Sequence, residues 1–218
     1  MHGCHSIWNS PPSFLAFKNN RKTLLSRLQA VFDDHPNLDF PAFDGIPDDI
    51  DPFTVFAFVN RGLSRENATL TCAGFKRAFG LASEVPELFP GLPRMDNRNV
   101  YFFRSREHRG DDVDKLWQAF EAALTLANDD RRTFAEAFDA ALALPGIKWN
   151  LTTGLFWIRP SVYLSLDGIN RWAIDECSLL GEAPSKMLRE RQKFCVHGII
   201  GARQTGASNE HEHQTQFS

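Results

Sequence analysis

The sequence predicts an α+β fold, a helix-rich single domain with a small antiparallel sheet. Apolar residues recur at helical spacing from residue 20 to residue 144, which indicates amphipathic helices. Three other runs are rich in β-branched and aromatic residues, as strands are. A length of 218 residues suits one domain, and 43% hydrophobic with 23% charged residues is ordinary for a globular protein.

Helix start and stop signals bound the expected helices. Asp51-Pro52 is typical of a helix start, because the carboxylate can accept a backbone N–H and proline suits the first helical position. Gly62 and Gly80 are typical of helix ends. The helices around Gly62 resemble a helix-turn-helix, although a plain αα-hairpin is the commoner outcome. The expected helices cover residues 20–35, 53–60, 64–79, 113–127 and 130–144.

Residues 100–103, 155–158 and 162–166 are the expected strands, and Asp167-Gly168 is a turn signal. Little periodicity precedes residue 19 and the helical and strand patterns stop after Trp172. The sequence therefore predicts three parts. These are a poorly ordered N-terminal segment (1–18), a folded module (19–172) and a divergent, partly disordered tail (173–218).

No motif of nucleotide chemistry is present. The chain has no GxxxxGK[ST] and no GxGxxG after an expected strand, so we expect no NTPase activity and no cofactor. The histidine and cysteine clusters near the two ends do not supply four ligands at a structural zinc spacing, so we expect no metal site. We expect a protein that is not an enzyme, unless a site is assembled from residues distant in sequence.

Location follows from similar evidence. No stretch reaches the ~18–20 apolar residues of a membrane span, and no secretory signal opens the chain. The four cysteines are scattered without a CxxC pair. This usage fits a reducing compartment, so we expect a cytoplasmic protein without a membrane partner.

An arginine-rich run around Tyr101-Phe102-Phe103 is the strongest candidate binding site. Arginines can contact phosphates in bidentate fashion and aromatic rings can stack on exposed bases. A strand with its aromatic residues in the core and charged ends that prevent edge pairing would give the same pattern. Lys148 and Arg171 could extend the surface. The candidate nucleic-acid-binding residues are Arg94, Arg98, Tyr101, Arg104, Arg106, Arg109 and Arg159.

Several of these runs, taken together, resemble one family. The most specific is KWNLTTGLFWIRP at residues 148–160, followed by YLSLD at 163–167 and NRW at 170–172. Earlier runs agree: DPFTVF (51–56), NRG (60–62), FKRAFGL (75–81), GLP (91–93), RGDDVDKLW (109–117) and FEAA (120–123). From residue 14 to 172 the chain resembles the module that precedes the motor in McrB-like AAA+ proteins. Those proteins are the GTP-hydrolysing subunits of modified-cytosine-dependent restriction systems.

The resemblance implies a non-catalytic recognition module. The implied target is DNA, modified or not, and the implied partners are the motor or nuclease subunits of a restriction system. No catalytic residue is available to carry over. After Trp172 the chain departs from the family, and truncation or a frameshift near Ala173 is one hypothesis for the departure. The alternative is a protein-interaction module that positions the motor or its nuclease partner.

Overall fold

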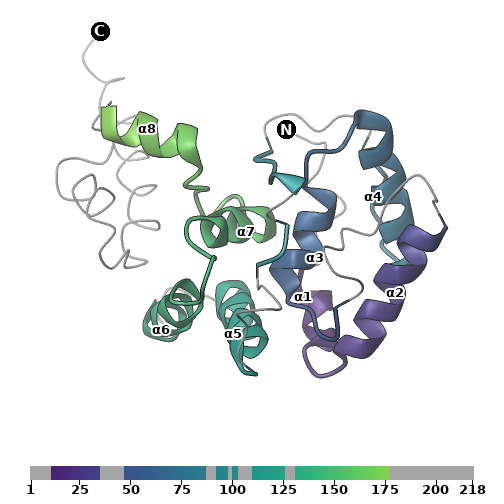
Figure 1. The fold of residues 1–218 in the computed structure, drawn as a ribbon, viewed down its shortest axis with the longest axis horizontal. Coiled ribbons are helices and arrows are strands. Elements are labelled where there is room, and N and C mark those ends of the chain that lie inside the picture. Colours follow the sequence, from purple (N-terminus) through teal and green to yellow (C-terminus); the bar gives the residue numbers. More distant parts are fainter. Residues whose placement is uncertain are drawn as a thin grey trace, which may run out of the picture.

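The computed structural model describes residues 11–34, 47–86, 92–97, 100–102, 110–125 and 131–176, and this part of the chain is helical (Figure 1). The elements in order are α1 (Pro11–Phe14), the 3₁₀ turn η1 (Leu15–Phe17), α2 (Arg21–Asp33), α3 (Pro52–Val59), α4 (Arg65–Phe79), α5 (Asp112–Thr125), α6 (Arg131–Leu142), α7 (Asn150–Ile158) and α8 (Gly168–Glu176). The five helices expected from periodicity and capping are confirmed as α2 to α6.

The predicted α+β class with an antiparallel sheet is wrong. Within the described ranges there is no strand, and the nearest approach to one is an isolated parallel bridge between Arg61 and Met95. The expected strand at 155–158 is the second half of α7, while residues 162–166 and 100–102 pair with no strand. Residue 103 lies outside the described residues.

Burial on every side explains the error at α7. Seven of its nine residues are buried, so the helix shows no polar face to reveal its period. A short, continuously apolar run has the same appearance in a buried helix and in a buried strand. The aromatic and branched residues at its end then favour the strand by composition alone.

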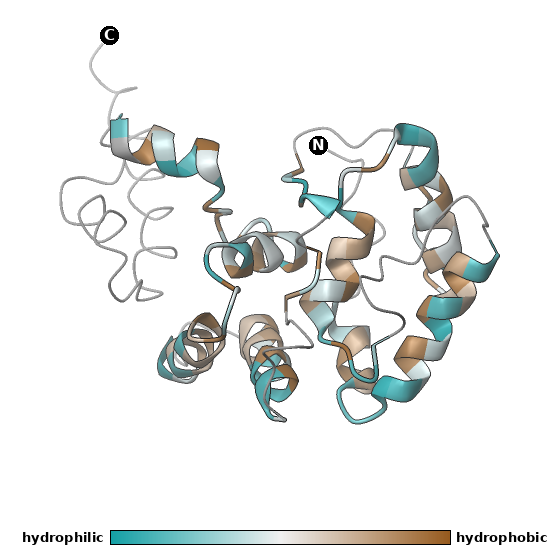
Figure 2. Cartoon of the chain, in the orientation of Figure 1, coloured by the Kyte–Doolittle hydropathy of each residue, from teal (hydrophilic) through white to brown (hydrophobic). Residues whose placement is uncertain are grey.

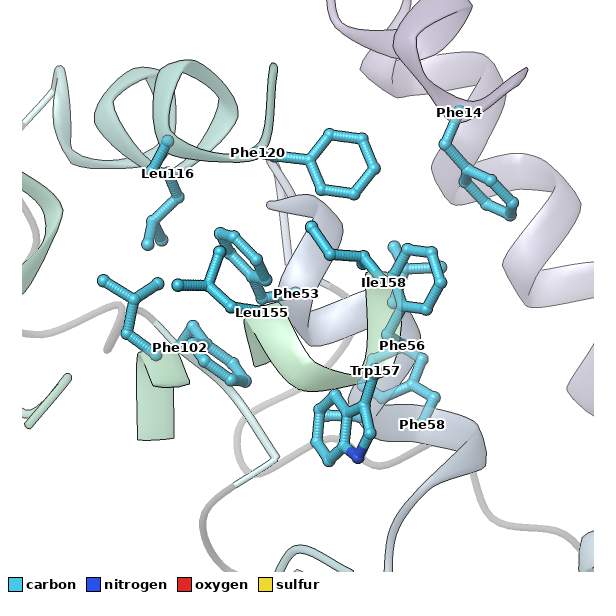
Figure 3. Packing of buried hydrophobic residues seen from close by; sticks show 14 of the residues in the cluster. Phe14, Phe53, Phe56, Phe58, Phe102, Leu116, Phe120, Leu155, Trp157 and Ile158 are labelled. Carbon is cyan, nitrogen blue, oxygen red and sulfur yellow. The ribbon is translucent and has the colours of Figure 1, made fainter. Parts of the chain in front are cut away.

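Helix α3 lies at the centre of the molecule, and all eight of its residues are buried. The side chain of Asp51 caps its first turn by accepting the N–H of Thr54, at 3.0 Å, and Pro52 occupies the first helical position. Phe53 and Phe56 face residues of α5 and α7 across the core (Figure 3). A helix that is apolar on every side has to be enclosed by other elements, and α3 is enclosed in this way.

Two helix pairs flank α3. Helices α2 and α4 pack together on one side, where Gly74 allows close approach: an added Cβ would lie 2.7 Å from Val31 Cγ1. Helices α5 and α6 form the second pair, and α5 reaches α3 through the edge of Phe120 against Phe53, with ring centroids 5.8 Å apart. Helix α7 completes the enclosure by packing on α3 and α5.

The core begins earlier in the sequence than residue 19. Phe14, at the end of α1, is 1% exposed, and its ring lies 5.5 Å from that of Phe56 and 5.0 Å from that of Phe79. Lys18 ties the same region to α5 by its ion pair with Glu121. Arg21, at the start of α2, pairs with Asp114 of α5 and with Asp49.

Helix α8 projects from the rest of the molecule (Figure 1). Its start is held by Asp167, which accepts the N–H of Asn170 at 2.9 Å, and by a bond from Asn170 Nδ2 to the Ser165 carbonyl at 2.8 Å. Brown and teal residues alternate along α8, whereas α3 is mostly brown (Figure 2). None of the helices in the described part of the chain has both the length and the apolar character needed to cross a bilayer.

Candidate nucleic-acid interface

Three of the seven predicted binding residues fall in the described ranges: Arg94, Tyr101 and Arg159. The other four lie outside the described residues, and they are Arg98, Arg104, Arg106 and Arg109. The structure therefore locates the arginine-rich segment only through its described residues, 94–97, 100–102 and 110.

The first fixed point of this segment is Met95, at the C-terminal end of α3. The Met95 N–H donates to the Asn60 carbonyl at 2.8 Å, and the Gly62 N–H donates to the Met95 carbonyl at 3.1 Å. Asn97 adds a side-chain bond to the Gly62 carbonyl at 3.3 Å. With Met95 itself buried, the segment is attached to the turn that follows α3.

The second fixed point is Phe102, at the other end of α3. Its N–H donates to the Thr54 hydroxyl at 3.0 Å, and that hydroxyl donates to the Asp51 carboxylate. The Phe102 ring packs on Phe53, with centroids 5.5 Å apart. The helix cap of α3 thus also anchors a segment about fifty residues further along the chain.

Burial changes the chemistry of the cap. Asp51 is fully buried, and this desolvation raises its pKa from 3.8 to about 6, although bonds from the Thr54 hydroxyl and from backbone amides oppose the rise. Burial favours the neutral form of a carboxyl because the charged form loses its hydration. Asp51 is a structural group here, since its bonds go to Thr54.

Tyr101 packs on α3. Its ring meets that of Phe58 edge-on, with centroids 5.7 Å apart, and burial raises the pKa of its phenol while the nearby Arg61 charge opposes the rise. Arg61 is itself buried, with its guanidinium 6.0 Å from the Phe32 ring. Tyr101 is therefore half-buried, and much of its surface is taken up by the protein rather than open to a base.

Arg94 and Arg159, far apart in sequence, attach to the same end of α7. Trp157 Nε1 donates to the Pro93 carbonyl at 2.9 Å, which places the exposed Arg94 beside the last turn of that helix. Arg159 follows the same turn, and its Nη1 donates to the Ala123 carbonyl of α5 at 2.9 Å. Arg159 thus has a structural bond, and Arg94 is the freer of the two cations to meet a ligand.

A second basic and aromatic group lies at the opposite end of α7. The Arg171 guanidinium is 5.3 Å from the centre of the Trp149 ring, which joins α8 to the turn before α7. Lys148 beside Trp149 is exposed, and Trp172 beside Arg171 is 63% exposed. We call Lys148, Trp149, Arg171 and Trp172 the α7–α8 corner.

Sequence reasoning placed Lys148 and Arg171 near strands and could not bring them together. The available signal was the repeated basic–aromatic dipeptide, Lys148-Trp149 and Arg171-Trp172. Only the packing of α8 against the turn before α7 makes the two dipeptides neighbours. Among the described residues, no group of three or more His, Cys, Asp and Glu side chains is arranged to hold a metal ion.

Comparison with known proteins gives one match. A family model described as "Domain of unknown function (DUF8425)" matches residues 9–187. No curated protein and no solved structure matches the chain.

Proposed function

The chain belongs to the DUF8425 family, whose model covers most of its length, and on that premise we propose that it is a non-catalytic module that recognises DNA. The sequence resemblance to the modules of McrB-like restriction proteins supports this proposal. In that setting the module is cytoplasmic, and its partners are the motor or nuclease subunits of a restriction system. DNA with modified cytosine is the target that the resemblance favours.

The observation that carries the proposal is the anchoring of the arginine-rich segment. Met95 and Phe102 fix it to the two ends of α3, and Asp112 begins α5 directly after it. From residue 94 to residue 110 the sequence has five arginines and two acids, within a chain of net charge −3. A locally basic segment on a rigid support suits a polyanion.

Such a segment would act mainly through phosphates. Arginine binds phosphate oxygens in a bidentate geometry, and each phosphate neutralised releases counterions from duplex DNA. Phosphate contacts position a protein on DNA, whereas base contacts specify the sequence. The proposal therefore predicts a strong salt dependence, and any preference for modified cytosine requires further contacts to the base.

Fluorescence anisotropy with labelled duplexes, modified and unmodified at cytosine, tests the proposal. Affinity for duplex should fall steeply between about 50 and 200 mM salt. Arg94→Ala should weaken binding and reduce the slope of log K against log salt by about one. Arg132→Ala is the matched control, because this exposed arginine of α6 pairs only locally, with Glu136. Absence of binding to either duplex at low salt would reject the proposal.

The same titration distinguishes the alternative, a protein-interaction module that positions the motor or nuclease. That alternative predicts that Arg104→Ala and Arg106→Ala leave DNA affinity unchanged. The DNA proposal predicts that both weaken it. Circular dichroism of each variant controls for loss of fold.

A further inference from the structure

We propose that the α7–α8 corner is a second nucleic-acid site, one that binds unpaired nucleotides by stacking on Trp172 and by phosphate contacts to Lys148 and Arg171. This inference goes beyond the duplex contacts proposed above. It uses other residues, at the opposite end of α7, and a different form of nucleic acid.

The backbone at Lys148 is the first observation. Lys148 has φ of 46°, and it is the one non-glycine residue with positive φ in the described part of the chain. L-residues with side chains rarely adopt this conformation, and strained positions of this kind concentrate at functional sites. The neighbouring Ile147 is buried and holds the turn, while the Lys148 side chain is exposed. Packing therefore does not explain why a lysine rather than a glycine stands here.

The second observation is that the segment leading into α8 is bonded to α7. The Leu166 N–H donates to the Thr152 hydroxyl at 2.9 Å, and the Thr153 and Ser165 hydroxyls are 2.9 Å apart. Ile174, near the far end of α8, is buried. These bonds, with the Arg171 guanidinium over the Trp149 ring, place the first turn of α8 beside the turn before α7. An aromatic platform of this kind loses little conformational entropy when a ligand stacks on it.

Charge and area favour a nucleic acid over a protein as the occupant. Arg171 lies over the Trp149 ring, the exposed Lys148 precedes Trp149 in sequence, and Asp167 is already bonded to Asn170. Ile169 and Trp172 are the large apolar side chains exposed in the described residues. Two side chains are few for a protein interface, which buries about 800 Å² on each partner. One ring flanked by cations suits a base and its phosphates.

Glu176 is an acidic residue exposed at the C-terminal end of α8. It lies one helical turn beyond Trp172. Its negative charge disfavours a phosphate at that end of α8. A bound strand would therefore extend from Trp172 toward Lys148. The proposal thus makes Lys148, and not the end of α8, the main phosphate contact.

The test titrates the full chain with a labelled oligothymidine of about ten nucleotides, a length within the range that single-strand sites occupy. Anisotropy reports affinity, and intrinsic tryptophan emission reports stacking. Trp172→Ala should weaken binding about tenfold or more and abolish most of the emission change. Lys148→Gly should weaken binding severalfold and reduce its salt slope by about one. Because glycine adopts positive φ readily, Lys148→Gly should fold at least as well as the wild type.

The controls separate this inference from the proposed function. Arg132→Ala should leave oligothymidine binding unchanged, and Arg94→Ala should affect duplex more than single strand. If the chain binds oligothymidine but not duplex DNA, the proposed function is rejected and the inference about the α7–α8 corner is retained. If Trp172→Ala and Lys148→Gly both bind oligothymidine with the affinity and the emission change of the wild type, the α7–α8 corner is not a binding site. So would self-association of the chain through α8 that oligothymidine fails to compete with.

Discussion

Helices α3 and α8 are short helices of eight and nine residues, and an aspartate accepts a backbone N–H at the start of each. Every residue of α3 is buried, whereas α8 exposes Ile169 to 78% and Trp172 to 63%. The large side chains of α3 fill the core, whereas Ile169 and Trp172 of α8 have no comparable packing role. Substitutions in α3 should therefore report on stability, and substitutions of Ile169 and Trp172 on binding.

The sharpest test of this contrast removes one ring from each helix. Phe53→Ala should lower the free energy of unfolding by about 3–5 kcal/mol, because it removes a fully buried ring and leaves a cavity. Trp172→Ala should change it by less than about 0.5 kcal/mol. Urea unfolding followed by circular dichroism measures both. If Trp172→Ala lowered the free energy of unfolding by several kcal/mol, the Trp172 ring would be covered in solution, and the contrast between α3 and α8 would be wrong.

The two capping aspartates allow a test by pH. The pKa of Asp51 is raised from 3.8 to about 6 in the folded state, so the folded protein binds the proton more tightly than the unfolded chain. The contribution of Asp51 to stability is therefore largest below pH 3.8 and is lost as pH rises through about 6. A rise of about two in the pKa corresponds to a change of roughly 3 kcal/mol in the free energy of unfolding.

Asp51→Asn should remove this dependence. The difference in unfolding free energy between variant and wild type should shift in favour of the variant as pH rises from 4 to 7, because only the wild type acquires a buried charge. Asp167→Asn at the start of α8 is the matched control, since asparagine also caps helices and this side chain is half-buried. Parallel pH profiles of wild type and Asp51→Asn would contradict the prediction.

Two glycines give the smallest expected effect. At Gly154 of α7 an added Cβ would lie 2.7 Å from Phe53 Cδ1 and 3.3 Å from Phe102 Cε1, so Gly154→Ala should cost about 1–3 kcal/mol. At Gly168 of α8 an added Cβ meets nothing within 4 Å, so Gly168→Ala should be neutral or stabilise by up to about 1 kcal/mol. Thermal melting of the pair measures the difference. Equal melting temperatures would show that α7 can move away from α3.

The sequence allowed prediction of helices where local chemistry and period agreed. Asp51-Pro52 identified the start of α3, and Ser64 with Gly80 bounded α4, where Ser64 accepts the Asn67 N–H and Gly80 is left-handed. Helix α7 carries no such signal, since Trp149 makes no side-chain cap. Helix α7 is helical because it is buried against α3, and the spacing of residues within α7 does not reveal that burial.

The candidate site was predictable in part for a similar reason. Arg94 and Arg159 were identified by composition, but only the Trp157 bond to the Pro93 carbonyl brings them to one end of α7. The structural bond of Arg159 to Ala123 depends on helix packing that no spacing rule contains. The α7–α8 corner depends likewise on the packing of Arg171 over Trp149.

The enclosure of α3 has a consequence for biosynthesis. Its cover comes from both directions along the chain, from Phe14 before it and from Phe102, Phe120 and Gly154 after it. A ribosome adds about 5–20 residues per second, and about a hundred residues separate Phe53 from Gly154. The phenylalanines of α3 therefore leave the ribosome on the order of 5–20 s before α7 can cover them. During that interval α3 is the segment of the nascent chain that a chaperone would bind most readily.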